Sequence, residues 1–185
     1  MEHSGTKVLE TARLFLRPFV AGDADDMYRN WACDPDVTRY LTWPVHASPE
    51  VSRKLLIEWS GQYTQKDYYM WAIVLKEIGQ PIGSISVVSH DDKIGSAAIG
   101  YCIGKKWWRQ GIASEALRRV IAYLIGEIGY NRLEAYHDAN NPNSGAVMRK
   151  SGMTYEGTLR QSCRNNQGLC DACYYAILAE EWRAG

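Results

Sequence analysis

A short loop that opens a helix carries the clearest chemical signal in this sequence. The loop covers residues 108–116 and follows an apolar stretch at residues 97–103. Gly111 and Ala113 have little or no side chain, so an anion can approach the backbone closely. The first N–H groups of a helix have no partner inside the helix, and the helix N-terminus adds positive potential. The pattern predicts a cradle for a diphosphate group.

Two common phosphate-binding loops do not match this segment. A Walker loop ends in Gly-Lys-Ser/Thr, and residues 108–116 contain no such ending. A dinucleotide fingerprint needs three glycines after the first strand of a parallel repeat, whereas this loop lies past the middle of the chain. The loop therefore belongs to another kind of nucleotide-binding site.

The elements around the loop predict one mixed sheet with helices. Strands are expected near residues 14–19, 69–76, 81–88, 96–103, 132–137, 155–160 and 172–178. The three at residues 69–76, 81–88 and 96–103 are joined by short turns, which favours an antiparallel meander. The order strand, helix (residues 114–127), strand then favours one parallel pair.

Shorter helices are expected before and after this central part. Asp23 is a candidate N-cap for a helix through about Ala32, and Ser48 is a candidate N-cap for a second helix. Ser144 is expected to open a short helix that ends at Gly152, a good residue for a left-handed helix end.

Length and composition favour a single soluble domain. The chain has 185 residues and a formal net charge of +0, so no global field attracts it to nucleic acid or to a membrane. No apolar run approaches the roughly 20 residues that cross a bilayer, and residues 1–7 lack the apolar core of a signal peptide. We expect a loose tail at residues 1–8, one domain at residues 9–182 and a cytoplasmic location.

The five cysteines predict reduced thiols and no metal site. Their number is odd and their spacing irregular. Residues 163, 170 and 173 contain a single C-x-x-C pair with no fourth ligand nearby, which does not favour zinc.

Several segments resemble one enzyme family, the GNAT superfamily of N-acetyltransferases. They are residues 14–18, 82–85, 107–116, 141–153 and 156–160. The set is most similar to the branch that contains the ribosomal-protein N-terminal (alanine/serine) acetyltransferases, and the resemblance covers about residues 9–182. Trp108 stands where the superfamily usually has Gln or Arg, but aromatic residues are common there in this branch.

The resemblance implies an α/β (α+β mixed) fold and a chemistry. The fold is a central mixed, mostly antiparallel sheet with helices on both faces. The enzyme moves an acetyl group from acetyl-CoA, a cosubstrate, to a primary amine by direct attack on the thioester. A homodimer is common in the branch.

The resemblance also implies where acetyl-CoA binds. Two strands splay apart at a bulge, for which Gly100 is the candidate because a glycine inside a strand often marks one. The expected cofactor-binding residues are Tyr101, Cys102 and Ile103 on the strand, Arg109, Gln110, Gly111, Ile112, Ala113 and Ser114 in the loop, and Asn141 beside the pantetheine arm. Ser114 is also a candidate helix N-cap, and Asn141 a turn former.

Acetyl transfer needs a neutral amine, a polarised carbonyl and a proton for the leaving thiolate. A free α-amine has a pKa of about 8 and a lysine amine about 10.4, so an N-terminus is the easier acceptor to deprotonate. Many superfamily members use a tyrosine as the acid, but the equivalent residue here is Met148. In the ribosomal-protein branch the matching candidates are Ser144 as acid and Glu156 as base. Their alternative roles are helix capping and support of a strand edge.

The acceptor is expected opposite the cofactor, with Tyr40, Trp43 and Asp171 as candidate contacts. A protein N-terminus, especially that of a ribosomal protein, is the first choice. Small-molecule amines such as polyamines, aminoglycosides or amino acids come next, since a fold does not choose a substrate. A non-catalytic acyl-CoA-binding domain is a further alternative, supported by Met148. An ATP-binding regulator is the least favoured reading.

Overall fold

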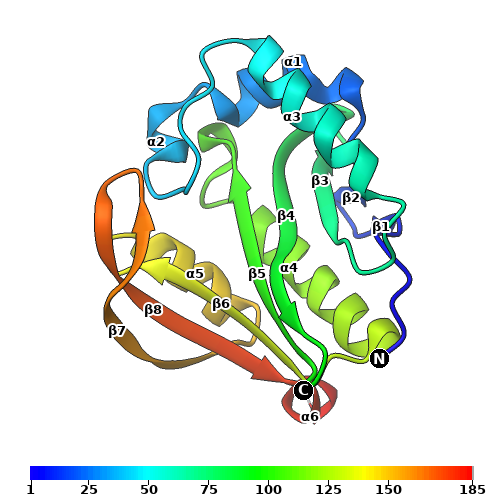
Figure 1. Ribbon diagram of the computed structural model, residues 1–185, viewed down its shortest axis with the longest axis vertical. Coiled ribbons are helices and arrows are strands. Elements are labelled where there is room, and N and C mark those ends of the chain that lie inside the picture. The colour runs from blue at the N-terminus through cyan, green and yellow to red at the C-terminus, as the bar shows by residue number, and fades with distance from the viewer. Residues whose placement is uncertain (185) are drawn as a thin grey trace.

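A single eight-stranded sheet forms the centre of the protein (Figure 1), in a computed structural model that describes residues 1–184. The spatial order is β1-β2-β3-β4-β5-β6-β8-β7. The strands are β1 (Leu9–Glu10), β2 (Leu14–Arg17), β3 (Met70–Leu75), β4 (Gln80–Asp91), β5 (Ser96–Ile103), β6 (Arg132–Asp138), β7 (Thr154–Asn165) and β8 (Gly168–Leu178). Among the strands of residues 1–184, only β5 and β6 pair in parallel. The predicted mixed, mostly antiparallel sheet is confirmed, including the place of its parallel pair.

Helices cover both faces of the sheet, as predicted. They are α1 (Ala24–Met27), α2 (Pro35–Thr38), α3 (Pro49–Gln62), α4 (Ile112–Tyr123), α5 (Pro142–Lys150) and α6 (Ala179–Ala184), with π-helical turns at Tyr28–Ala32 and Leu124–Ile128. Side chains along β3 alternate between two cores because successive strand residues point to opposite faces. Trp71 and Ile73 pack in the core that includes α4, whereas Ala72 and Val74 pack with α1 and α3.

The parallel pair opens after three residues. Ser96–Ala98 of β5 pairs with residues 132–134 of β6, and beyond that point the two strands diverge (Figure 1). The remaining residues of β5 pair with β4 alone among the described residues. This divergence is the splay that the resemblance implied.

The bulge beside the splay lies on β4, so its assignment to Gly100 is wrong. The register passes from Val87 opposite Ile99 to Ser89 opposite Ala98, which leaves Val88 as the extra residue. Gly100 is regularly paired. A Cβ there would lie 2.9 Å from the Val88 Cγ1 atom, so this glycine makes room for the bulge instead of forming it.

Residues 1–8 carry no helix or strand, yet they are attached to the sheet and to α4. Trp71 Nε1 in β3 donates to the Lys7 carbonyl at 2.7 Å, and the Tyr123 hydroxyl in α4 donates to the Gly5 carbonyl at 2.7 Å. The division into a tail and one domain stays a prediction. Across residues 1–184, no helix combines the length and the apolar composition needed to cross a membrane.

Cys163 and Cys170 are joined by a disulfide, which overturns the prediction of reduced thiols for these two residues. The hairpin of β7 and β8 places them directly opposite each other, with Cα atoms 5.3 Å apart. Cys33, Cys102 and Cys173 are free.

Candidate active site

The loop before α4 presents unpaired backbone N–H groups. Gly111 is the helix N-cap, in a left-handed conformation with φ +74°, and α4 begins at Ile112. The N–H groups of Ile112, Ala113 and Ser114 therefore have no acceptor four residues earlier in the helix. Arg109 is also left-handed, with φ 61°, and alternating handedness turns successive N–H groups toward one side as an anion-binding nest.

Ser114 is not the helix N-cap, because α4 starts two residues earlier than expected. The residue is 4% exposed, and its backbone carbonyl accepts from the Ser151 hydroxyl at 3.4 Å. Its backbone N–H, in the first turn of α4, is suited to an anion.

Arg13, which the sequence did not point out, braces the loop. Its Nη1 donates to the Gln110 carbonyl at 3.0 Å and its Nε donates to the Glu115 carboxylate at 2.6 Å. Burial alone would raise the pKa of Glu115, but hydrogen bonds from Thr11 and Arg13 lower it below its ordinary value. No local pattern could have indicated this contact, since Arg13 lies 97 residues before Gln110.

The basic residues around the loop differ in whether their charge is already paired within the protein. Lys105 forms an ion pair with Asp36 in α2, and the Lys106 ammonium lies 5.4 Å from the centre of the Trp107 ring. Arg109 is exposed. Arg13 and Arg109 are therefore the cations best placed beside the nest.

Gly111 offers a direct test of the loop. Replacing Gly111 with alanine puts a Cβ on a left-handed residue, which costs about 1–2 kcal/mol, and places a methyl group where the backbone must approach an anion. We expect the KM for acetyl-CoA to rise at least tenfold, with kcat within about threefold. Steady-state kinetics at a saturating amine acceptor measures both values. Gly79→Ala, at a left-handed turn outside the loop with φ +67°, is the matched control and should leave KM unchanged.

The splayed edge of β5 carries Tyr101, Cys102 and Ile103. They pair with Ile85, Ser84 and Gly83 of β4 and lie beyond the last β5–β6 pair. Their strand is thus open on the side of β6, where backbone amides can meet a ligand. The Cys102 side chain itself is buried against Ser84, and burial raises the pKa of its thiol.

The Tyr101 side chain crosses the splay and reaches the start of α5. Its hydroxyl lies 2.9 Å from the Ser144 carbonyl oxygen and 3.0 Å from the Ser144 Oγ. The carbonyl can only accept, so the phenol donates to it, and the Ser144 hydroxyl keeps its proton for the phenol oxygen or for a ligand. Burial raises the pKa of the Tyr101 phenol, which keeps it protonated at neutral pH.

Helix α5 starts at Pro142 with Asn141 as N-cap, so the prediction that Ser144 caps this helix is wrong. The Asn141 carbonyl accepts from the Ser144 N–H at 3.1 Å, while the Asn141 side chain makes no capping hydrogen bond. Both side chains thereby stay available to a ligand. Met148 is buried in the core, 1% exposed, and has no donor group.

His137 is a buried polar residue next to this pair. Its Nδ1 donates to the Asp138 carbonyl at 2.8 Å, because a carbonyl oxygen can only accept, and its Nε2 lies on the other side of the ring. Within residues 1–184 that Nε2 has no hydrogen-bond partner, and it presses against Gly145, where a Cβ would lie 2.5 Å away. Gly145 is thus the residue that lets α5 approach β6.

Glu156 is not brought together with Ser144. Its two carboxylate oxygens accept from Arg132 at 2.8 and 2.6 Å, and these hydrogen bonds lower the pKa of Glu156. Arg132 stands opposite Ser96, five residues before Tyr101, which at about 3.3 Å per residue places the ion pair roughly 16 Å along the sheet. A fixed, low-pKa carboxylate at that distance stabilises the sheet and is poorly suited to act as the base.

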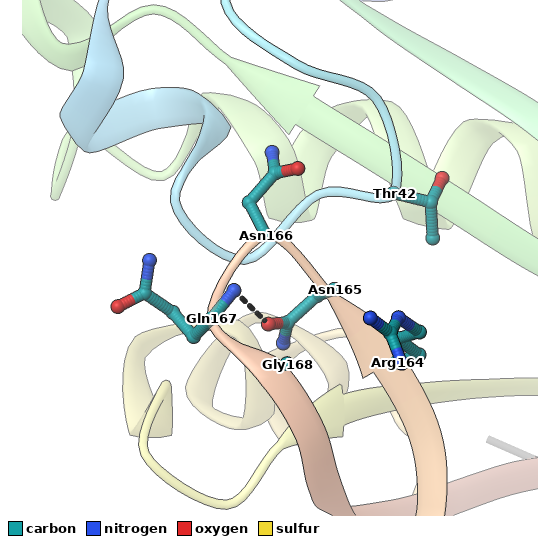
Figure 2. A pocket seen from close by; sticks show the side chains of 6 residues that line it. All are labelled: Thr42, Arg164, Asn165, Asn166, Gln167 and Gly168. Carbon is teal, nitrogen blue, oxygen red and sulfur yellow. Dashed lines mark hydrogen bonds between the residues drawn. The ribbon is translucent and has the colours of Figure 1, made fainter.

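A pocket of about 680 Å³ lies between the segment after α2 and the β7–β8 hairpin (Figure 2), and Tyr40, Trp43 and Asp171, the predicted acceptor contacts, are not among the residues that line it. Its lining consists of Thr42, Arg164, Asn165, Asn166, Gln167 and Gly168. Trp43 holds the hairpin in place through its carbonyl, which accepts from Asn166 Nδ2 at 2.8 Å. The Tyr40 hydroxyl donates to the Asn140 carbonyl at 3.1 Å, next to Asn141.

Asp171 has a different role. Its carboxylate accepts from the Gln161 N–H at 2.8 Å, where β7 is irregular, and its carbonyl accepts from the Ala139 N–H. It positions the hairpin and the loop before α5, outside the pocket lining.

Comparison with known proteins agrees with this geometry. Residues 13–154 match the family described as "Acetyltransferase (GNAT) domain". The chain is 31% identical to the uncharacterized N-acetyltransferase YoaA of Bacillus subtilis, over 92% of this chain and 96% of that one. It is 27% identical to the ribosomal-protein-serine acetyltransferase of Escherichia coli, over 76% of this chain and 78% of that one.

Among solved structures, the GNAT-family acetyltransferase from Bacillus anthracis superimposes with a TM-score of 0.81 at 25% identity, covering 94% of this chain and 99% of that one. A family match over most of the chain, a shared fold and the loop before α4 lead to one conclusion. The protein is an N-acetyltransferase and belongs to the GNAT acetyltransferase family.

Proposed function

We propose that this enzyme transfers the acetyl group of acetyl-CoA to the α-amine of a peptide or protein N-terminus. The observation that carries the proposal is the alignment of three features along one path. These are the anion nest at Gly111, the open edge of β5 and the Tyr101–Ser144 pair.

The chain's own groups suggest how acetyl-CoA is held. The N–H groups at the start of α4, with Arg13 and Arg109 beside them, bind the diphosphate. Backbone amides on the open edge of β5, near Tyr101 to Ile103, bind the pantetheine arm, and the Asn141 side chain faces it. An amide that donates to the thioester carbonyl stabilises the charge that develops on this oxygen during attack.

The transfer is a direct displacement at the carbonyl carbon. The lone pair of a neutral amine forms the new C–N bond, the C–S bond breaks, and the CoA thiolate takes up a proton while the nitrogen loses one. Ser144 donates its hydroxyl proton to the thiolate, and the Tyr101 phenol positions that hydroxyl. Since Glu156 is held by Arg132, the nitrogen passes its proton to water after attack, and water returns a proton to Ser144, so that no net proton is gained or lost by the protein. An α-amine with a pKa of about 8 also needs no strong base to become neutral before attack.

The pocket favours an acceptor that carries carbonyl or carboxylate groups. The Arg164 guanidinium and the side-chain amide of Gln167 can donate hydrogen bonds to such oxygens, and the guanidinium repels a polycation. A peptide N-terminus fits this chemistry better than a polyamine or an aminoglycoside does. The kinship with a ribosomal-protein-serine acetyltransferase supports a ribosomal N-terminus as the first peptide to try.

The proposal is tested first by calorimetric titration with acetyl-CoA, with CoA and ATP as controls. We expect micromolar binding of acetyl-CoA and none of ATP. Acetylation is then measured on peptides that mimic ribosomal N-termini, on spermidine and on free amino acids. Absence of acetyl-CoA binding up to about 1 mM removes the proposed donor, and preferred acetylation of spermidine removes the proposed acceptor.

Arg164 provides the sharper test of acceptor choice. The variant Arg164→Glu reverses the charge of the pocket and should lower kcat/KM for peptides about tenfold or more while improving it for spermidine. Arg160→Glu, an exposed arginine of the same strand outside the pocket, is the matched control. Equal peptide kinetics in the two variants would contradict the assignment of the pocket.

A further inference from the structure

Three side chains that bind metals well meet at the end of the sheet away from the active site. They are His3 in the N-terminal segment, His90 near the end of β4 and Asp92 in the turn that follows. His90 stands opposite Ala97, at the paired end of β5, whereas Tyr101 lies four residues further on. The acetyl-transfer chemistry therefore gives these residues no role.

Their ligand atoms already stand close to the separation that a zinc ion requires. All three lie within 4.8 Å of one another. The Asp92 carboxylate is 3.0 Å from His3 Nε2 and 2.8 Å from His90 Nδ1. Zinc ligands at about 2.0–2.1 Å in tetrahedral geometry lie roughly 3.3 Å apart. The two contacts of Asp92, made by Oδ2 to His3 and by Oδ1 to His90, would therefore open by only a few tenths of an ångström.

An outer partner orients the His3 imidazole as a metal site needs it. His3 Nδ1 lies 2.8 Å from the Tyr69 hydroxyl, which leaves Nε2 for the metal. The Asp67 carboxylate lies 3.9 Å from His90 Nε2, beyond hydrogen-bond distance, on the side of the ring opposite to Nδ1. A metal-binding histidine commonly donates its second ring N–H to such a partner, which sets its tautomer and orientation.

Charge and exposure are consistent with an ion at this place. The side chains are 18%, 28% and 52% exposed for His3, His90 and Asp92, so an ion has access and a water can complete its shell. The carboxylates of Asp67 and Asp92 favour a cation over an anion here.

We propose that His3, His90 and Asp92 form a zinc site with water as the fourth ligand. The bound ion ties the N-terminal segment to the turn between β4 and β5. The prediction of no metal rested on cysteine spacing alone. It did not consider this group, in which His3 lies 87 residues before His90 and 89 residues before Asp92.

The test uses the full-length enzyme after treatment with a chelator and titration with zinc chloride. We expect one zinc per chain with micromolar or tighter affinity. Cobalt substituted at the site should show the intense visible absorption of a tetrahedral ion. Asp92→Asn and His90→Gln should each weaken zinc at least about 100-fold, which exceeds the usual 10- to 100-fold effect of outer-shell changes.

The matched control is Glu127→Gln. It removes another carboxylate that holds the same segment, through Lys7 at 3.3 Å, and should leave zinc affinity unchanged. Circular dichroism of each variant verifies that it folds. No zinc binding by the parent enzyme up to about 1 mM would overturn the proposal, and so would affinity that survives both Asp92→Asn and His90→Gln.

Discussion

Replacing Ser144 with alanine is expected to lower kcat about 100-fold, near the lower end of what loss of a general acid costs. The effect belongs at that end because a thiolate, with a pKa near 8.5, leaves with little help from an acid. The affinity for acetyl-CoA should stay within twofold, since the helix does not use the Ser144 side chain as its cap. Stopped-time assays at saturating acetyl-CoA, together with calorimetry, separate the two quantities.

Tyr101→Phe completes this prediction. The variant keeps the buried ring and removes the hydroxyl that contacts Ser144. We expect kcat to fall about tenfold with little change in KM, and the double variant with Ser144→Ala to be no slower than Ser144→Ala alone. Such non-additivity is the signature of two groups that act as one unit. Independent losses that multiply in the double variant would show that the phenol acts separately.

Glu156→Gln is the contrast within the same experiment. It breaks the ion pair with Arg132. Because the Glu156 side chain is 43% exposed, the free energy of unfolding should fall by about 1 kcal/mol or less. We expect kcat within about threefold of the parent. A drop comparable to that of Ser144→Ala would restore Glu156 as the base and overturn the role in sheet stability given to it here.

The parallel pair and the anion loop could be predicted from the sequence because their signals are local. A helix between two apolar strands forces a crossover, and a glycine before a helix offers its N–H groups whatever the rest of the chain does. The contacts that complete the site are not local. Tyr101 meets Ser144 from 43 residues away and Arg13 meets Gln110 from 97, and no spacing rule reports such pairs.

Each wrong assignment has its own physical cause. Helices α4 and α5 begin earlier than their serines suggested, since backbone groups of Gly111 and Asn141 start them without a side-chain cap. The bulge residue is Val88, a good strand former with no compositional sign of a bulge. The β7–β8 hairpin is longer than the sequence indicated. Strand β7 is largely exposed and lacks the alternation of apolar and polar residues that marks a strand, so the sequence did not indicate that Cys163 pairs with Cys170.

Gly104 is where the fold and the loop meet, and Gly104→Ala should destabilise the protein strongly. A Cβ at this position would collide with the Asn30 carbonyl oxygen and the Trp107 ring. The Asn30 side chain is itself fixed to the Pro81 carbonyl at 2.8 Å, and the Gly104 N–H donates to the Ile82 carbonyl at 2.8 Å. Neither Asn30 nor Gly104 can shift to make room for a Cβ without moving the end of β5.

We expect this substitution to lower the free energy of unfolding by about 3 kcal/mol, the upper end for overpacking, and Tm by about 6–12 °C for a chain of this size. The KM for acetyl-CoA should rise as well, because residue 104 joins the open edge of β5 to the anion loop. Thermal unfolding followed by circular dichroism measures the first effect and steady-state kinetics the second.

Gly61→Ala is the same chemical change at a site with room for it. Gly61 lies in α3 and a Cβ there meets nothing within 4 Å, so alanine should stabilise the helix by about 0.5–1 kcal/mol. The two variants thus change the free energy of unfolding in opposite directions, and the reason is steric. If Gly104→Ala unfolds within 2 °C of the parent enzyme, the close approach of Asn30 to the end of β5 is not what holds the loop in place, and Arg13 alone must do so.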